Sequence, residues 1–222
     1  MRSASFILAL SLLFYGARSQ SKLGLEQYSF MHAGENNGWS PVAHYQTSKK
    51  WYAEARYNYE DFQTFSLYAG KTFSAENEVS YSFTPMIGGM LGRLNGGSLG
   101  LNTELNFRKF SFSSQSQYSF STDNQRSNFF YSWSELSYQP LNWVYTGIAI
   151  QHTRFYQANT LMEPGVLLGF SFQHWLFPLY TFNPFGNSPY FVVGMSWEWK
   201  HGKGTPKTIT PQLTTRTDDP MQ

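Results

Sequence analysis

The chain lacks cysteine altogether, and only 14% of its 222 residues are charged. Without cysteine it has no disulfide framework, no thiolate zinc site, no thiol nucleophile and no cysteine-linked lipid anchor. Ordinary globular domains carry about a quarter charged residues, so this sequence is poor in charge. A formal net charge of +2 argues against a strongly basic nucleic-acid binder, and we expect no nucleic-acid partner.

Aromatic side chains are abundant where charges are scarce. The sequence contains 20 Phe, 15 Tyr and 7 Trp, yet its mean hydropathy is −0.41. Many large rings in an overall polar chain indicate segments that are apolar on one side and rich in hydroxyls or amides on the other. The length suits one large domain or two small ones.

Residues 1–19 have the pattern of a secretory signal peptide. Arg2 supplies the positive start, an apolar run covers 6–15, and Ala17-Arg18-Ser19 offers a cleavage site before Gln20. The run is shorter than the roughly 20 residues of a transmembrane helix, and an uncleaved interfacial anchor is the alternative. Cleavage would leave 14 basic and 14 acidic side chains, so the exported body would be formally neutral.

After residue 20 the dominant pattern is strict alternation. In the segment 51–59, Ala53, Ala55 and Tyr57 alternate with polar residues such as Glu54 and Arg56. The same period of two recurs in segments 79–84, 99–108, 110–120, 148–151 and 168–173. Successive side chains of a strand point to opposite faces, so each segment has one apolar and one polar face. No later segment has 18 consecutive apolar residues.

Two architectures use such strands: a soluble sandwich or lipocalin-like barrel, and a transmembrane β-barrel with its apolar face toward lipid. Export, strands of roughly 9–12 residues, and a polar face with few charges favour the membrane form. We therefore predict an all-β fold, an antiparallel transmembrane β-barrel preceded by a cleaved signal peptide. The predicted parts are the signal peptide 1–19, the barrel 20–200 and a disordered polar periplasmic tail 201–222.

The alternating segments predict about twelve strands. They are 24–33, 41–48, 50–60, 63–73, 77–89, 97–108, 110–121, 128–139, 143–154, 164–174, 177–183 and 189–199. A ten-strand barrel is the alternative, because 24–33 and 177–183 are the weakest segments. Connections alternate between tight turns and longer loops such as Gly34–Ser40, Thr122–Ser127 and Tyr156–Pro164. Outer-membrane barrels have short periplasmic turns and longer external loops, so both termini should be periplasmic.

Many aromatic residues fall at the predicted periplasmic ends of strands, where they would form a girdle at the lipid headgroups. This predicted girdle consists of Trp51, Tyr52, Trp143, Tyr145, Trp175, Trp197 and Trp199. The terminal strand 189–200 is amphipathic and ends in aromatic positions. The expected partners are therefore outer-membrane lipids and, through the C-terminal strand, the barrel-assembly machinery.

The polar faces of the strands should line the lumen. The charged lumen candidates are Glu54, Arg56, Glu78, Glu104 and Arg108. Glu135 is left undecided, because the alternation of 128–139 is ambiguous. These charges would either select ions at a constriction or pair with one another inside a narrow barrel. Their mixed signs favour pairing.

Evidence for a catalytic or metal site is weak. His32 and His44 fall on one face, but two imidazoles do not make a metal site, and we expect no metal and no cofactor. The segment 96–100 matches Gly-x-Ser-x-Gly, yet that motif needs a strand-to-helix elbow and here it enters an alternating strand. The glycine-rich stretch 88–97 lacks the Gly-Lys-Ser/Thr ending of a phosphate loop. We therefore assign no catalytic residue.

The segments 51–61 and 130–138 together resemble exported β-barrel proteins of Gram-negative bacteria that have no assigned activity. The resemblance extends over about 24–199 and implies a bacterial outer-membrane barrel, without transferring any active-site residue. The predicted function is a narrow channel, or an accessory or structural component of the outer membrane, with an unknown solute. The alternative is a lipid-modifying outer-membrane enzyme such as a phospholipase or lipid A deacylase.

Overall fold

The computed structural model describes residues 21–32, 38–123, 125–156, 160–186 and 188–201. The predicted signal peptide 1–19 and residues 202–222 of the predicted tail lie outside the described residues. The described chain contains thirteen strands and one short 3-10 helix, η1 (Gln125–Ser127). The strands are β1 (Ser21–His32), β2 (Gly38–Gln46), β3 (Trp51–Tyr57), β4 (Thr64–Lys71), β5 (Phe73–Glu76), β6 (Ser80–Gly92), β7 (Gly96–Phe107), β8 (Phe110–Ser121), β9 (Phe129–Leu141), β10 (Val144–Phe155), β11 (Thr160–Phe172), β12 (Trp175–Phe182) and β13 (Tyr190–His201).

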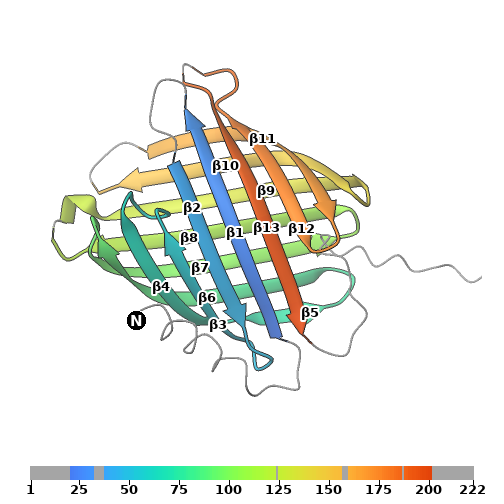
Figure 1. Ribbon diagram of the computed structural model, residues 1–222, viewed down its shortest axis with the longest axis horizontal. Coiled ribbons are helices and arrows are strands. Elements are labelled where there is room, and N and C mark those ends of the chain that lie inside the picture. The colour runs from blue at the N-terminus through green and yellow to red at the C-terminus, as the bar shows by residue number, and fades with distance from the viewer. Residues whose placement is uncertain (1–20, 33–37, 124, 157–159, 187, 202–222) are drawn as a thin grey trace, which may run out of the picture.

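Twelve of these strands form a closed antiparallel ring (Figure 1). The first strand β1 pairs with the last strand β13 over its whole length, and β4 pairs with β6. The extra strand β5 follows β4 after Thr72 and pairs with the start of β6, so β4 and β5 act as one interrupted wall strand. The twelve-strand prediction is confirmed, including its weakest segments, which are β1 and β12, and the ten-strand alternative is wrong.

Alternation of side chains gives the barrel an apolar outer wall. Large apolar residues such as Ile87, Leu91 and Ile148 are 63%, 70% and 60% exposed. Side chains on the opposite face of the strands are buried and frequently polar, as Ser66, Ser98 and Ser119 show. The barrel therefore has its apolar surface outside, which is the arrangement of a membrane-spanning barrel and the reverse of a soluble one. No helix in the described part of the chain is long and apolar enough to cross a membrane.

A polar patch lies on the outer wall, at the centre of β8 and β9. Ser114, Ser116, Ser132 and Ser134 form a closed square of hydroxyl contacts of 2.9–3.4 Å. In such a square each hydroxyl can donate once and accept once, so no donor is left without a partner. The square also explains the ambiguous alternation of 128–139. On β9 the outward side carries serines, whereas the inward side carries Trp133.

The outward face of the barrel leads to a first prediction. Replacing Ile148 on β10 with Arg should destabilise the barrel by about 2–4 kcal/mol, because the charge would enter the hydrocarbon region. The matched control is Asn102→Arg on β7, where the new cation would lie inside, beside Glu54. Equilibrium folding into lipid vesicles measures both variants, and equal losses on the two faces would contradict the membrane-facing assignment.

Candidate functional site

One arginine is fully enclosed inside the barrel. Arg56 on β3 is 2% exposed, and its Nε forms an ion pair with an oxygen of Glu54. Its Nη1 lies 3.1 Å from Oε1 of Glu60 and donates a 2.5 Å hydrogen bond to Oε1 of Gln117 on β8. A guanidinium removed from water needs such compensation, since an unpaired buried charge is strongly destabilising.

Two tyrosine rings complete the enclosure. The guanidinium carbon lies 4.5 Å from the ring centroid of Tyr59 and 4.4 Å from that of Tyr68, which is cation–π geometry. The Tyr68 hydroxyl donates to Glu60 at 3.0 Å. We name Arg56 with Glu54, Glu60, Tyr59 and Tyr68 the arginine cage.

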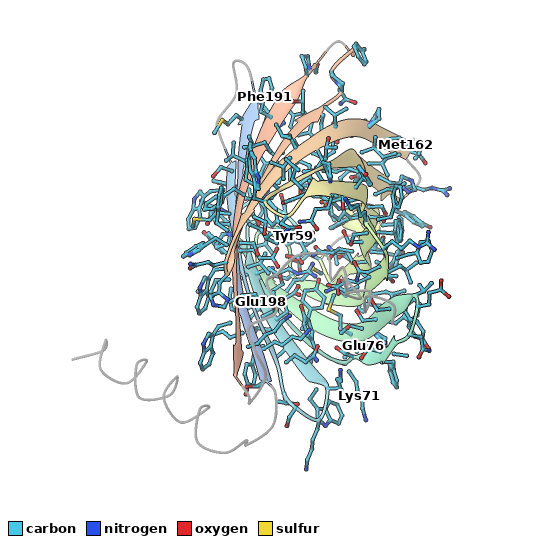
Figure 2. The ribbon with its side chains drawn as sticks, turned by 90° about the vertical axis from the view of Figure 1, so that its right-hand side faces the viewer. Tyr59, Lys71, Glu76, Met162, Phe191 and Glu198 are labelled. Carbon is cyan, nitrogen blue, oxygen red and sulfur yellow. The ribbon has the colours of Figure 1, made fainter. Side chains whose placement is uncertain are left out.

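The β3–β4 connection brings Tyr59 and Glu60 into the lumen. Asn58 and Gln63 adopt φ values of 54° and 53°, and the Asn58 Oδ1 accepts a 2.7 Å hydrogen bond from the Gln63 backbone N–H. This geometry folds the connection inward, and Figure 2 shows Tyr59 inside the ring of strands, with Phe191 and Met162 on its outside. Burial raises the pKa of the Tyr59 phenol, so the phenol stays protonated as a donor.

From this connection a line of side chains crosses the lumen. The Tyr59 hydroxyl donates to Oε1 of Gln115 on β8 at 2.6 Å. Its ring meets Tyr131 of β9 edge-on, with centroids 6.0 Å apart and planes at 90°. The Tyr131 hydroxyl then donates to Oε1 of Gln151 on β10 at 3.2 Å. We name Tyr59, Tyr131 and Gln151 the lumen crossing, since they join the β3 side of the barrel to β10.

Two buried amides, one in the crossing and one in contact with Arg56, keep a free donor. Gln117 and Gln151 are 4% and 6% exposed, and their Nε2 atoms have no hydrogen-bond partner among the described residues. Buried polar groups are normally paired, and ordered water or a ligand supplies the partner when the protein does not. These atoms therefore mark places where a lumen occupant would bind.

The far side of the crossing is filled by an aromatic cluster. It comprises Trp133, Tyr145, Ala149, Leu167, Tyr180, Phe182, Tyr190 and Val192, with Tyr28, Phe30, Tyr131 and Leu176 packed against it. Trp133 is central, because its ring lies 5.1 Å from that of Tyr180 and 5.4 Å from that of Phe182, both edge-on. The lumen is consequently narrower than the strand count alone suggests.

The structure distributes the predicted lumen charges over three environments. Glu54 and Arg56 lie in the arginine cage and pair along one strand. Glu104 is exposed near the end of β7, with its Oε2 3.4 Å from the Ser82 hydroxyl. Glu78 lies in the bend between β5 and β6, and Arg108 in the two-residue turn between β7 and β8.

The position of Arg108 has a local cause. Its φ of 52° closes the tight turn, and its guanidinium lies 5.1 Å from the Phe107 ring centroid. The side chain therefore stays with the hairpin end and does not reach the arginine cage.

Glu135, Glu60 and Glu26 also face the lumen. Glu135 accepts a 2.8 Å hydrogen bond from the Tyr180 hydroxyl, and Glu26 accepts one from Tyr28 at 2.8 Å. Glu60 is not among the lumen charges predicted from the sequence. Its even number places it on the same side of the chain as Glu54 and Arg56, which could have indicated an inward side chain. This indication holds only because the connection folds into the lumen.

The residues of the predicted girdle fall into two groups, one on the outer wall and one inside the barrel. Trp51, Trp143, Trp175 and Trp199 are exposed on the outer wall, and Trp197 lies beside Trp175 with rings 6.4 Å apart. Tyr52 and Tyr145 instead point into the barrel, because each occupies the inward side of the pleat. Tyr52 donates to Glu54, and Tyr145 packs in the aromatic cluster over Gly169, where a Cβ would collide with its ring.

The two histidines considered as metal ligands have separate partners. His32 stacks on Tyr190 with ring centroids 4.5 Å apart. His44 lies with Nδ1 3.4 Å from Oε1 of Glu26 and stacks on Tyr52. Among the described residues no group of three or more His, Asp or Glu side chains is placed to hold a metal ion.

Solved structures of small outer-membrane porins share this fold. The KdgM porin aligns with a TM-score of 0.59 at 13% identity, over 78% of this chain and 98% of that one. The NanC porin aligns with a TM-score of 0.52 at 9% identity, over the same shares of the two chains. No protein-family model and no curated protein matches the sequence. At these identities the likeness establishes the fold, that of an outer-membrane β-barrel.

The arginine cage generates a stability prediction. Arg56→Met would leave Glu54 and Glu60 buried without a cation, which should cost about 3–5 kcal/mol. Adding Glu54→Gln and Glu60→Gln to that variant should recover part of the loss, since the triple variant carries no uncompensated charge. Heat-modifiable gel mobility across a urea series measures the stability of each variant.

Glu104→Gln is the control for the cage, because this carboxylate is exposed and should change stability by less than about 0.5 kcal/mol. If Arg56→Met left unfolding unchanged, the charges would be individually hydrated, and the paired network would be refuted.

Proposed function

We propose that this protein is a narrow channel in the bacterial outer membrane. The observation that carries the proposal is the lumen crossing, in which single side chains restrict the lumen between the polar arginine cage and the aromatic cluster. The side-chain amides of Gln117 and Gln151 line the restriction, and each has an N–H donor without a partner. A path for water or a small polar solute requires such hydrogen-bonding groups along its wall. The passage would be set by Tyr59 and Tyr131, which approach from opposite walls.

The structural neighbours support a channel in general terms. One of them is the KdgM porin in complex with disordered oligogalacturonate, which aligns at 11% identity with a TM-score of 0.59. The ligand belongs to that protein, and the solute of the present barrel has to be inferred from its own lumen.

The same proposal includes export and membrane insertion. Residues 1–19 would be removed as a signal peptide, the outer wall would contact outer-membrane lipids, and β13 would be recognised by the barrel-assembly machinery. The pairing of Ser21 with His201 places the beginning of β1 and the end of β13 at one end of the barrel, together with the tight turns. That end would be periplasmic.

Planar-bilayer recording tests the channel directly. Purified protein should produce discrete conductance steps in KCl. A complete lack of conductance, together with turnover of phospholipid or lipid A, would instead establish the lipid-modifying enzyme.

Truncating the crossing should widen the channel. Tyr59→Ala removes the ring that meets Tyr131 and the hydroxyl that binds Gln115, so the single-channel conductance should rise by about twofold or more, since conduction depends on the width of the restriction. Tyr81→Ala is the matched control, because that ring lies exposed on the outer wall of β6 and should leave conductance unchanged. Equal conductance of the two variants would show that Tyr59 does not limit the passage.

Orientation in the membrane is tested by single cysteines, since the chain has none of its own. A cysteine at Asp123, in the β8–β9 connection, should react with an impermeant reagent on intact cells. A cysteine at Lys49, in the tight β2–β3 turn, should react only after the outer membrane is opened. The reverse pattern would invert the topology.

A further inference from the structure

The lumen contains a second cluster with the chemistry of the arginine cage but without its cation. A chain of contacts runs from Glu26 to Tyr28 (hydrogen bond, 2.8 Å), then to Trp133 (ring centroids 5.6 Å apart). It continues from Trp133 to Tyr180 (5.1 Å) and ends where the Tyr180 hydroxyl binds Glu135 at 2.8 Å. We name these five residues the acidic aromatic cluster.

The acidic aromatic cluster resembles the arginine cage closely. Each arrangement combines two glutamates with tyrosine hydroxyls that bind carboxylate oxygens, and with aromatic faces at their side. In the cage, the guanidinium of Arg56 occupies the space between them. In the acidic aromatic cluster, the basic group present among the described residues is His44, 3.4 Å from Glu26, and Glu135 has no ion-pair partner.

An independent observation lies beside the cluster. Gln151 is the cross-strand partner of Trp133, and its buried Nε2 has no hydrogen-bond partner among the described residues. Glu26 and Glu135 both accept hydrogen bonds from tyrosines inside the same lumen, and like charges in one confined space repel each other. A cation bound at these carboxylates would relieve this repulsion, and an oxygen on the same solute would satisfy the Gln151 amide.

We propose that the acidic aromatic cluster is the recognition site of the channel for small organic cations that carry an amine or a guanidinium group. Carboxylates supply the charge complement, and the faces of Tyr28, Trp133 and Tyr180 supply cation–π attraction, which is strongest for tryptophan. The inward glutamates Glu26, Glu54, Glu60 and Glu135 outnumber the single enclosed Arg56, so the walls around the restriction favour cations over anions. This inference rests on the proposed channel function.

Reversal potentials in a KCl gradient provide the first test. The wild-type channel should prefer K⁺ to Cl⁻, and methylguanidinium chloride should reduce its K⁺ current. Glu26→Gln combined with Glu135→Gln keeps an acceptor for each tyrosine hydroxyl but removes both charges. The permeability ratio of K⁺ to Cl⁻ should fall by about fivefold, the effect of a contact charge in a water-like medium, and block should weaken similarly.

Glu78→Gln is the matched control, since it removes an exposed carboxylate from a turn and should leave both readouts unchanged. A wild-type channel that prefers Cl⁻, or a double variant that keeps its cation preference and its block, would overturn the recognition site while leaving the channel intact. Calorimetric titration of methylguanidinium into detergent-solubilised protein gives a second readout. Binding that is lost in the double variant supports the site even without conductance, whereas unchanged binding in that variant refutes it.

Discussion

Every backbone N–H and C=O group of a chain that crosses a bilayer by strands must find its partner in another strand, because lipid offers none. The barrel meets this requirement at two seams, where β1 pairs with β13 and β4 pairs with β6. An open edge at either seam would expose a row of unpaired polar groups. The short strand β5 continues the pairing of β6 beyond the break at Thr72, so this long strand is paired on both sides of the break.

Closure of the ring determines the environment of every side chain. Once the ring is complete, one face of every strand points to the apolar exterior and the other into a confined lumen. A charge on the inner face is then partly removed from water, and it must be paired or it destabilises the barrel. Arg56 meets this condition through Glu54, Glu60 and Gln117, which come from β3, from the inward connection and from β8. The arginine cage thus results from the same constraint that closes the wall.

The outer wall shows how polar groups are tolerated where water is scarce. The four serines of β8 and β9 bind one another instead of leaving donors toward lipid. Inside the barrel, tyrosine hydroxyls likewise donate hydrogen bonds to glutamate carboxylates, at Tyr28, Tyr68 and Tyr180. Rings fill the volume while hydroxyls meet the carboxylates, which accounts for an aromatic-rich chain with a negative mean hydropathy.

The sequence by itself determined the strands, their number and which side of most of them is apolar, because a period of two is a local property of the chain. It identified Glu54 and Arg56 as inward charges for the same reason. Only the tertiary structure decided that Glu60 is internal, and that Glu26 and Glu135 belong to one cluster with Trp133. These positions depend on a connection folded into the lumen by two left-handed residues, and on contacts between strands far apart in sequence. Alternation gives the face of a side chain, but the closed ring decides which side chains meet across the lumen.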